Sequence, residues 1–202
     1  MNTMITRQQI DKRLIDLFEN TFGFTNDEFD TVLSLFELKK IKKKEHYFRA
    51  GDVCRQQAYI NKGCTRTYVI DNEGHERILF FAFEDWWIGD LESYYTQNPG
   101  LNYVQALEDC ELIILKREHF QRLSLENPKM QQWYTFKVQR AANAMWRRLS
   151  EVKVSSPEER YLNLLNNQPQ VIERVPLQYV AAYLNIEPPS LSRLRRRISQ
   201  KP

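Results

Sequence analysis

The spacing of apolar residues divides the 202-residue chain into three regions. In residues 1–45 apolar residues recur every three or four positions, which predicts amphipathic helices. The stretch KKIKKK (39–44) is expected to be a solvated connection that leads into a strand. The recurring residues are Ile10, Leu14, Leu17 and Phe18 in one set, and Phe29, Val32, Leu33 and Phe36 in the next.

Residues 46–115 show the shorter pattern of β-strands. Apolar runs in 58–83 are separated by NKG and DNEGH, whose Asn, Asp and Gly favour tight turns. A further turn is expected at AGD (50–52), and two more strands at 104–115. Several short strands at this spacing predict a small barrel or sandwich.

A long helix is expected from Pro128 to about Val152. It carries one apolar stripe, and Trp133, Ala142 and Trp146 extend its apolar character to a second side. One face can pack on the barrel while the other meets a second copy of the chain; the alternative is that both faces are ordinary core. The stripe consists of Tyr134, Val138, Ala141, Met145, Leu149 and Val152.

A new helix is expected to open in SSPEERYLNLL (155–165). Ser156 is a candidate N-cap, Pro157 fits the first helical position, and Glu159 completes a capping box. The domain boundary is therefore placed at residues 153–156.

Residues 175–198, VPLQYVAAYLNIEPPSLSRLRRRI, combine helical apolar spacing with four arginines among the last six residues. The small Ala181 allows a second helix to cross closely, and Asn185 falls where a left-handed backbone is needed. Pro176 is expected at the first position of one helix, and Pro188–Pro189 at the start of the next. With Leu177 as the first position of this predicted helix-turn-helix, the residues that fall at its apolar positions are Val180, Ala181, Leu184, Ile186, Leu191 and Leu194.

At about 100° per residue, the second of these helices turns Leu191, Leu194 and Ile198 toward the core. Its opposite face fits the DNA major groove, where arginine can pair with guanine O6 and N7. Basic residues in a last turn also occur as solvated helix ends. The candidate DNA-binding residues are Pro189, Ser190, Ser192, Arg193, Arg196, Arg197 and Gln178.

The charge distribution favours a polyanionic partner such as double-stranded DNA. Residues 1–154 hold 22 basic and 22 acidic residues, whereas residues 185–202 hold five basic residues and one acidic residue. The positive excess of the chain, +3 overall, therefore lies at its C-terminal end.

These motifs resemble those of Crp/Fnr-family transcription regulators, in the version common in Bacteroidetes, over nearly the whole chain. The resemblance implies an α+β fold: a cyclic-nucleotide-binding-type β-barrel of jelly-roll kind, a long dimerisation helix, and a C-terminal winged helix-turn-helix. The corresponding domains are a sensor domain with N-terminal helices at 1–127, the dimerisation helix at 128–154, and the DNA-binding domain at 155–202. The family fold also implies a homodimer that binds two half-sites about one DNA turn apart.

The resemblance assigns the family's base-reading arginine to Arg193. The family's base-reading glutamate corresponds to Pro189, and the arginine that precedes it in some members corresponds to Pro188. The operator best known for the family is therefore not assumed. VIER (171–174) is expected to form part of the wing, since few residues follow the recognition helix in the sequence.

The resemblance also places a phosphate-binding cassette in residues 88–106. Gly89 and Asp90 correspond to its Gly-Glu pair, but Gly100 and Leu101 stand where an arginine and a hydroxyl residue hold the phosphate. Because an unpaired buried phosphate is costly, cyclic AMP is not expected as the effector. Arg66 or Arg77 could supply the charge from another strand. The candidate effector pocket comprises Gly89, Asp90, Tyr94, Tyr103, Arg66 and Arg77.

The aromatic residues of this segment have two interpretations: an apolar effector pocket, or core and dimer packing. They are Trp86, Trp87, Tyr94, Tyr95 and Tyr103. No cofactor is expected, because the three cysteines are scattered and His75 is expected to be an exposed turn residue rather than a haem ligand. No metal site is predicted either.

An enzyme is not expected, because the sequence shows no nucleophile elbow and no Gly-rich phosphate loop. The start of the sequence lacks a signal-peptide pattern and no apolar run is long enough to span a bilayer, so a cytoplasmic protein without membrane contact is expected. The competing hypothesis is an effector-binding or protein-interaction module whose helix-turn-helix no longer contacts DNA; Pro188 and Pro189 favour it. The operator, the effector and the sign of regulation are not specified by the sequence.

Overall fold

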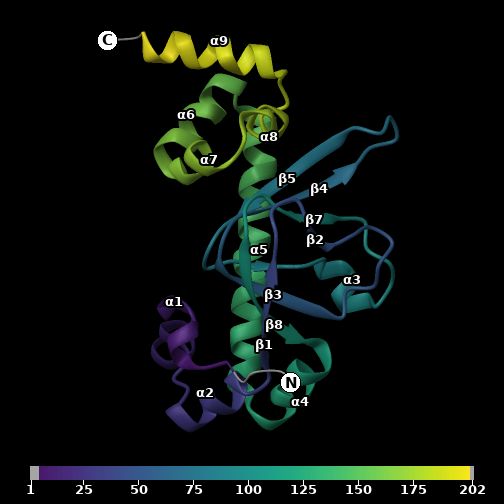
Figure 1. Ribbon diagram of the computed structural model, residues 1–202, viewed down its shortest axis with the longest axis vertical. Helices are drawn as coiled ribbons and strands as arrows, with labels where there is room; N and C mark the ends of the chain where they lie inside the picture. Colours follow the sequence, from purple (N-terminus) through teal and green to yellow (C-terminus); the bar gives the residue numbers. More distant parts are fainter. Residues whose placement is uncertain (1–4, 201–202) are drawn as a thin grey trace. The chain divides into compact units, whose positions relative to one another are not determined.

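A computed structural model describes residues 5–200 (Figure 1). Residues 1–4 and 201–202, which include Lys201 of the basic tail, lie outside the described residues. The chain divides into two compact units, the first formed by residues 1–67 and 82–140 and the second by residues 68–81 and 141–202. The hairpin of residues 68–81 thus groups with the C-terminal helices, which the sequence pattern did not indicate.

The N-terminal helices predicted by apolar spacing are present but short. They are η1 (Arg7–Gln9), α1 (Lys12–Asp16), η2 (Leu17–Thr21) and α2 (Asn26–Leu33). The inclusion of Phe36 in the helical pattern was wrong, because Phe36 begins strand β1 (Phe36–Ile41) and pairs with Leu115. Lys39 and Lys40 lie within β1 itself, so the lysine-rich stretch is partly strand rather than a connection before one. Pairing with a neighbouring strand here overrides the local helical spacing.

The barrel consists of two four-stranded sheets, with strand orders β1-β8-β3-β6 and β2-β7-β4-β5. This confirms the predicted small barrel, the turn at 50–52 and the strand positions within 58–83 and 104–115. The remaining strands are β2 (His46–Phe48), β3 (Gln56–Lys62), β4 (Thr65–Ile70), β5 (Glu76–Ala82), β6 (Trp87–Ile88), β7 (Tyr103–Ala106) and β8 (Cys110–Lys116).

Helix α3 (Leu91–Thr96) lies between β6 and β7, and α4 (Arg117–Glu126) and the long α5 (Pro128–Val154) follow the last strand. The first half of α5 belongs to the first unit, where its Trp133 is fully buried. The Trp133 ring packs on Phe18 and Trp87 at centroid distances of 5.4 and 5.1 Å. This aromatic core fixes α5 against the N-terminal helices and the β1-β8-β3-β6 sheet.

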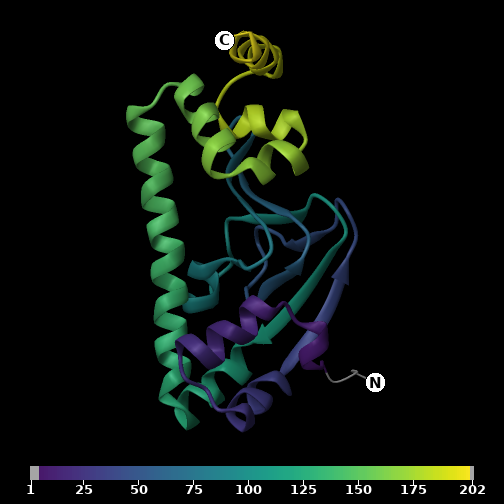
Figure 2. The same cartoon turned by 90° about the vertical axis from the view of Figure 1, so that its left-hand side faces the viewer.

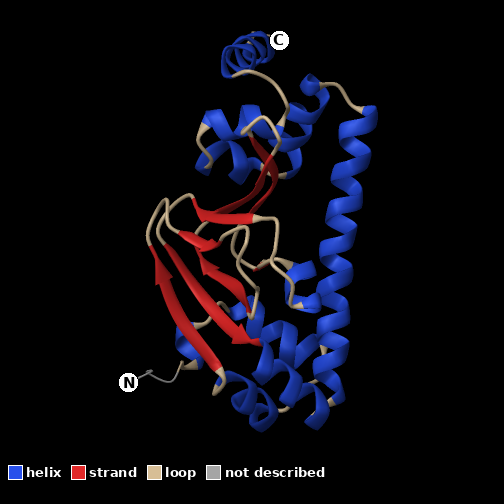
Figure 3. Cartoon of the chain, turned by 90° about the vertical axis from the view of Figure 1, so that its right-hand side faces the viewer, coloured by secondary structure: helices blue, strands red, loops and turns tan. Residues whose placement is uncertain are grey.

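The second unit contains four further helices, α6 (Pro157–Asn167), α7 (Pro169–Arg174), α8 (Leu177–Tyr183) and α9 (Pro188–Ser199), visible together in Figure 2. Ser156 caps α6 in a capping box with Glu159, as predicted. The assignment of VIER to a wing was wrong, because residues 171–174 lie in α7. From Pro157 to Ser199 the described chain holds helices and no strand (Figure 3). Each helix within residues 5–200 is too short or too polar to cross a bilayer.

Candidate nucleic-acid interface and barrel pocket

Helices α8 and α9 form the predicted helix-turn-helix. Ala181, Leu184 and Leu191 are almost completely inaccessible, so the apolar positions face one another across the turn. Asn185 adopts the left-handed conformation with φ 56°, which Asn tolerates better than most residues. Pro188 opens α9 as predicted, whereas Pro176 is the N-cap of α8 rather than its first helical residue.

A buried arginine beneath the turn was missed by the sequence analysis. Arg160 of α6 is 7% exposed, and its Nη2 donates to the carbonyl oxygen of Leu184 at 2.7 Å. A second donor from the same guanidinium reaches the carbonyl of Ser155. Carbonyls at a helix C-terminus have no partner within the helix, so Arg160 satisfies the end of α8 and fixes the turn before α9.

A second arginine holds α8 to the later part of α5. The Arg148 guanidinium lies 3.6 Å from the centre of the Tyr183 ring and donates to the Tyr183 carbonyl. Phe81 of the hairpin packs on the same ring, at 5.2 Å between centroids. Burial lowers the pKa of Arg148 from its usual value, but an arginine keeps its charge over the whole physiological range. These contacts give the helix-turn-helix a rigid support.

The outer face of α9 is cationic, as the sequence predicted. Arg193, Arg195 and Arg196 are exposed. Arg193 Nη2 donates to Ser190 Oγ at 3.1 Å, which orients its guanidinium toward the first turn of the helix. Arg197, a predicted DNA contact, is instead ion-paired with Glu158 of α6. Arg197 therefore serves the packing of the unit in this state.

The remaining predicted contacts are also exposed. Ser192 is exposed, and its Oγ donates to the Pro188 carbonyl at 3.1 Å. Pro189 is exposed on the first turn of α9, and Gln178 is exposed on α8. The structure thus places the predicted set on α8 and α9 of one helix-turn-helix, with Arg197 already paired.

In the cassette segment of the barrel, residues 88–106, the buried side chain of Asp90 fills the space beside Gly100. Asp90 is 2% exposed and caps α3, and its Oδ1 accepts from the Ser93 N–H at 2.9 Å. Its Oδ2 accepts from the Asn102 side chain at 2.9 Å. A Cβ at Gly100 would lie 2.6 Å from Asp90 Oδ2 and 2.8 Å from the Phe48 ring. A side chain at position 100, where the resemblance wants an arginine, therefore has no room.

Both candidate arginines are hydrogen-bonded to other side chains. Arg66 is buried in β4, and its Nε donates to Gln105 of β7 at 2.8 Å. Arg77 is wrong as a pocket residue in this structure, since its Nε pairs with Asp71 within the hairpin at 2.7 Å. Tyr94 is buried and Tyr103 is half-buried, while Tyr95 is largely exposed.

An aromatic cage in the barrel encloses a lysine that the sequence analysis missed. Lys137 of α5 is 7% exposed, and its ammonium lies 4.5–5.9 Å from four ring centres. It donates to Gln57 Oε1. Burial lowers the pKa of Lys137 from 10.5 to about 7. The four rings belong to Trp87, Tyr94, Trp133 and Tyr134. Trp87 and Tyr94 therefore act as core, in agreement with the packing interpretation.

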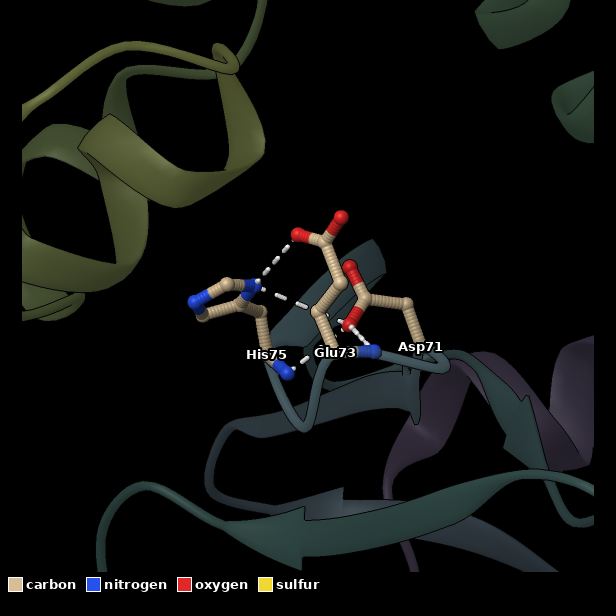
Figure 4. A group of neighbouring side chains, drawn as sticks. All are labelled: Asp71, Glu73 and His75. Carbon is tan, nitrogen blue, oxygen red and sulfur yellow. Dashed lines mark hydrogen bonds and ion pairs between the residues drawn. The ribbon is translucent and has the colours of Figure 1, made fainter.

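The tip of the β4–β5 hairpin brings Asp71, Glu73 and His75 together (Figure 4). The oxygens of Asp71 already accept from the backbone N–H groups of Glu73 and His75 and from Arg77. His75 lies near both carboxylates and is exposed, as expected for a turn residue. Hydrogen bonding within the turn accounts for the cluster without a metal.

The predicted stripe of α5 separates into two parts. Tyr134 packs on Phe120 at 4.7 Å between ring centroids and so belongs to the core of its own barrel. Met145, Leu149 and Val152 are 38–49% exposed, while Val138 and Ala141 are half-buried. The later half of the helix therefore carries an apolar face that its own chain leaves uncovered.

Comparison with known proteins defines the class of the barrel: residues 38–127 match the cyclic nucleotide-binding domain. The chain is 31% identical over 114 residues to the fumarate and nitrate reduction regulatory protein of Vibrio cholerae, a match that covers 55% of this chain and 44% of that protein. The chain thus matches less than half of the length of this relative.

Solved structures share the fold at low sequence identity. The c-di-GMP-responsive regulator CLP of Xanthomonas campestris superposes with a TM-score of 0.71 at 14% identity, covering 87% of this chain and 92% of that one. A transcriptional regulator of the Crp/Fnr family from Eubacterium rectale gives 0.69 at 14% identity, covering 91% and 86%. The chain is thus similar to Crp/Fnr-family regulators in fold, and residues 38–127 match the cyclic nucleotide-binding domain in sequence.

Proposed function

We propose that this protein is a dimeric, sequence-specific DNA-binding transcription regulator that does not depend on cyclic AMP. The observation that carries the proposal is the supported helix-turn-helix with Arg193, Arg195 and Arg196 exposed on its second helix. A rigid helix with a cationic outer face fits the major groove, and arginines beside it can bind phosphates. The relatives, which are named as regulators, support the same role.

Independence from cyclic AMP is supported by the closed cassette. The buried Asp90 carboxylate occupies the space beside Gly100, so position 100 has no room for the arginine that would pair with a cyclic phosphate.

The test is selection of binding sites from a random duplex pool, with and without cyclic AMP, at two salt concentrations. An enriched palindrome that is independent of cyclic AMP and weakens steeply as salt rises supports the proposal. Enrichment only with cyclic AMP contradicts the effector part. No enrichment in either arm contradicts DNA binding and favours the protein-interaction alternative.

Arg193→Ala tests whether the recognition helix reads bases. We expect the variant to lose about 1–3 kcal/mol of discrimination between the selected site and random DNA. Equal weakening on both sequences would restrict Arg193 to phosphate contact. The variant is expected to fold, because the Arg193 side chain is exposed and its hydrogen bond to Ser190 is local to α9; circular dichroism checks this.

Dimerisation through α5 is proposed from the uncovered face formed by Met145, Leu149 and Val152. Met145→Glu and Leu149→Glu are expected to yield monomers in light scattering, because each places a charge in an apolar interface. The matched control is Asn143→Glu, an exposed position about 160° around the helix from Met145, which is expected to leave the dimer intact. Dimers in all three variants would contradict this interface.

A further inference from the structure

The first turn of α9 has lost the groups that a helix N-terminus ordinarily offers. Pro188 and Pro189 occupy the first two positions, and neither has a backbone N–H. The next two N–H groups, of Ser190 and Leu191, both donate to the Glu187 carbonyl at 2.9 and 3.1 Å. This helix end therefore presents no free amide to a phosphate or to a base edge.

What the first turn does present is apolar. Pro188 and Pro189 are both exposed, and their rings are rigid and carry no donor or acceptor. The nearby Ser192 hydroxyl proton is already donated to the Pro188 carbonyl. The apolar group that the major groove displays is the C5-methyl of thymine, which proteins contact through small apolar side chains.

The spacing to Arg193 sets the geometry. Positions 189 and 193 lie one helical turn apart on the same face, about 6 Å along the helix axis. Stacked bases are about 3.4 Å apart, so the two side chains reach base pairs separated by one or two steps. The hydrogen bond from Arg193 to Ser190 Oγ directs the guanidinium toward this same first turn. The cationic face fits the DNA duplex by charge.

We propose that Pro189 reads the methyl group of a thymine that lies one or two base pairs from the guanine bound by Arg193, and that Ser190 positions Arg193 for this pair. The inference rests on the proposed function. At this position of the half-site the protein would recognise the base by an apolar contact with its methyl group. No hydrogen bond from a protein acceptor to the base would be needed there.

The experiment uses the operator selected above, with each thymidine replaced in turn by deoxyuridine, which removes only the methyl group. Fluorescence anisotropy at fixed salt measures the affinity of the full-length protein. At one position of the half-site, replacement of a single thymidine is expected to weaken binding about fourfold. This factor is the equivalent of about 0.8 kcal/mol for one buried methyl group. In Pro189→Gly, which leaves no side chain to contact a methyl group, the thymine operator binds more weakly, and the deoxyuridine replacement at that position has no further effect.

The matched control is Pro169→Gly, at an exposed proline in the first turn of α7, which is expected to keep the full deoxyuridine effect. For the positioning role, Ser190→Ala is expected to reduce discrimination at the guanine, and Ser190→Thr is expected to restore it. If no deoxyuridine position matters, or if Pro189→Gly retains the effect, the inference is wrong while DNA binding stands. Failure to select any operator instead contradicts the proposed function itself.

Discussion

Replacement of Lys137 by methionine removes the buried charge of the aromatic cage while keeping a flexible side chain of similar length. Lys137 is 7% exposed, and its ammonium has no carboxylate among its described contacts; it lies beside Gln57 and four aromatic rings. Burial holds the pKa of Lys137 at about 7, against 10.5 for the free side chain. In the folded protein this lysine therefore loses its proton at a much lower pH than in the unfolded chain.

The sign and size of the effect follow from proton linkage. Between pH 7 and pH 10.5 the unfolded chain binds the proton and the folded protein does not, so the free energy of unfolding rises with pH. The rise is about 1.4 kcal/mol per pH unit, or about 5 kcal/mol over the full interval. Below pH 7 both states are protonated and the folded state bears the whole cost of burying the charge. Lys137→Met lacks this dependence.

Urea unfolding, followed by the fluorescence of Trp87 and Trp133 beside Lys137, measures the difference at a series of pH values. From about pH 7.5 to about pH 9.5 the wild-type protein is expected to gain about 2–3 kcal/mol relative to Lys137→Met. Lys153→Met, an exposed lysine on the same helix, is the control and is expected to show no such change. A constant difference between wild type and Lys137→Met would refute the argument, because it would mean that the rings and Gln57 stabilise the ammonium as well as water does.

Three further substitutions test local structure by urea unfolding. Gly100→Ala is expected to lower the free energy of unfolding by about 1–3 kcal/mol, because the added Cβ would overlap the Asp90 carboxylate. The control Leu101→Ala, at an exposed residue, is expected to change it by less than about 0.5 kcal/mol. Equal effects of the two substitutions would contradict the close contact. Ser156→Ala removes the N-cap of α6 and is expected to cost about 1 kcal/mol, and a neutral result would show that the cap contributes nothing. Asn185→Ala places alanine at φ 56° and is expected to cost about 1 kcal/mol; unchanged stability would mean that the turn relaxes to another conformation.

Local patterns in the sequence were sufficient where a residue's role depends on its near neighbours. The capping box of Ser156 and Glu159, the left-handed Asn185 and the proline start of α9 are all set within a few residues, and all were confirmed. The apolar periods of the strands and of α5 located these elements, because burial of one face imposes the spacing along the chain.

The same local reasoning failed where contacts with distant segments of the chain determine the secondary structure of a residue. Phe36 continued a helical spacing but joined β1, because pairing with β8 satisfies its backbone. VIER was predicted as part of a wing but lies in α7, where Val171 is buried against its own unit. When two contacting residues are this far apart in the sequence, no periodic pattern of residues predicts their contact.

The sequence by itself determined the helix-turn-helix, its cationic face and a small barrel or sandwich, since each follows from periodicity, charge and short motifs. Only the tertiary structure showed that Arg160 fixes the turn, that Asp90 closes the cassette against Gly100, and that Lys137 lies in an aromatic cage. Arginine, aspartate and lysine ordinarily lie at the surface, so their residue type does not predict that they are buried. Their roles arise from groups brought together by folding, which supply the hydrogen bonds and rings that make a buried charge tolerable.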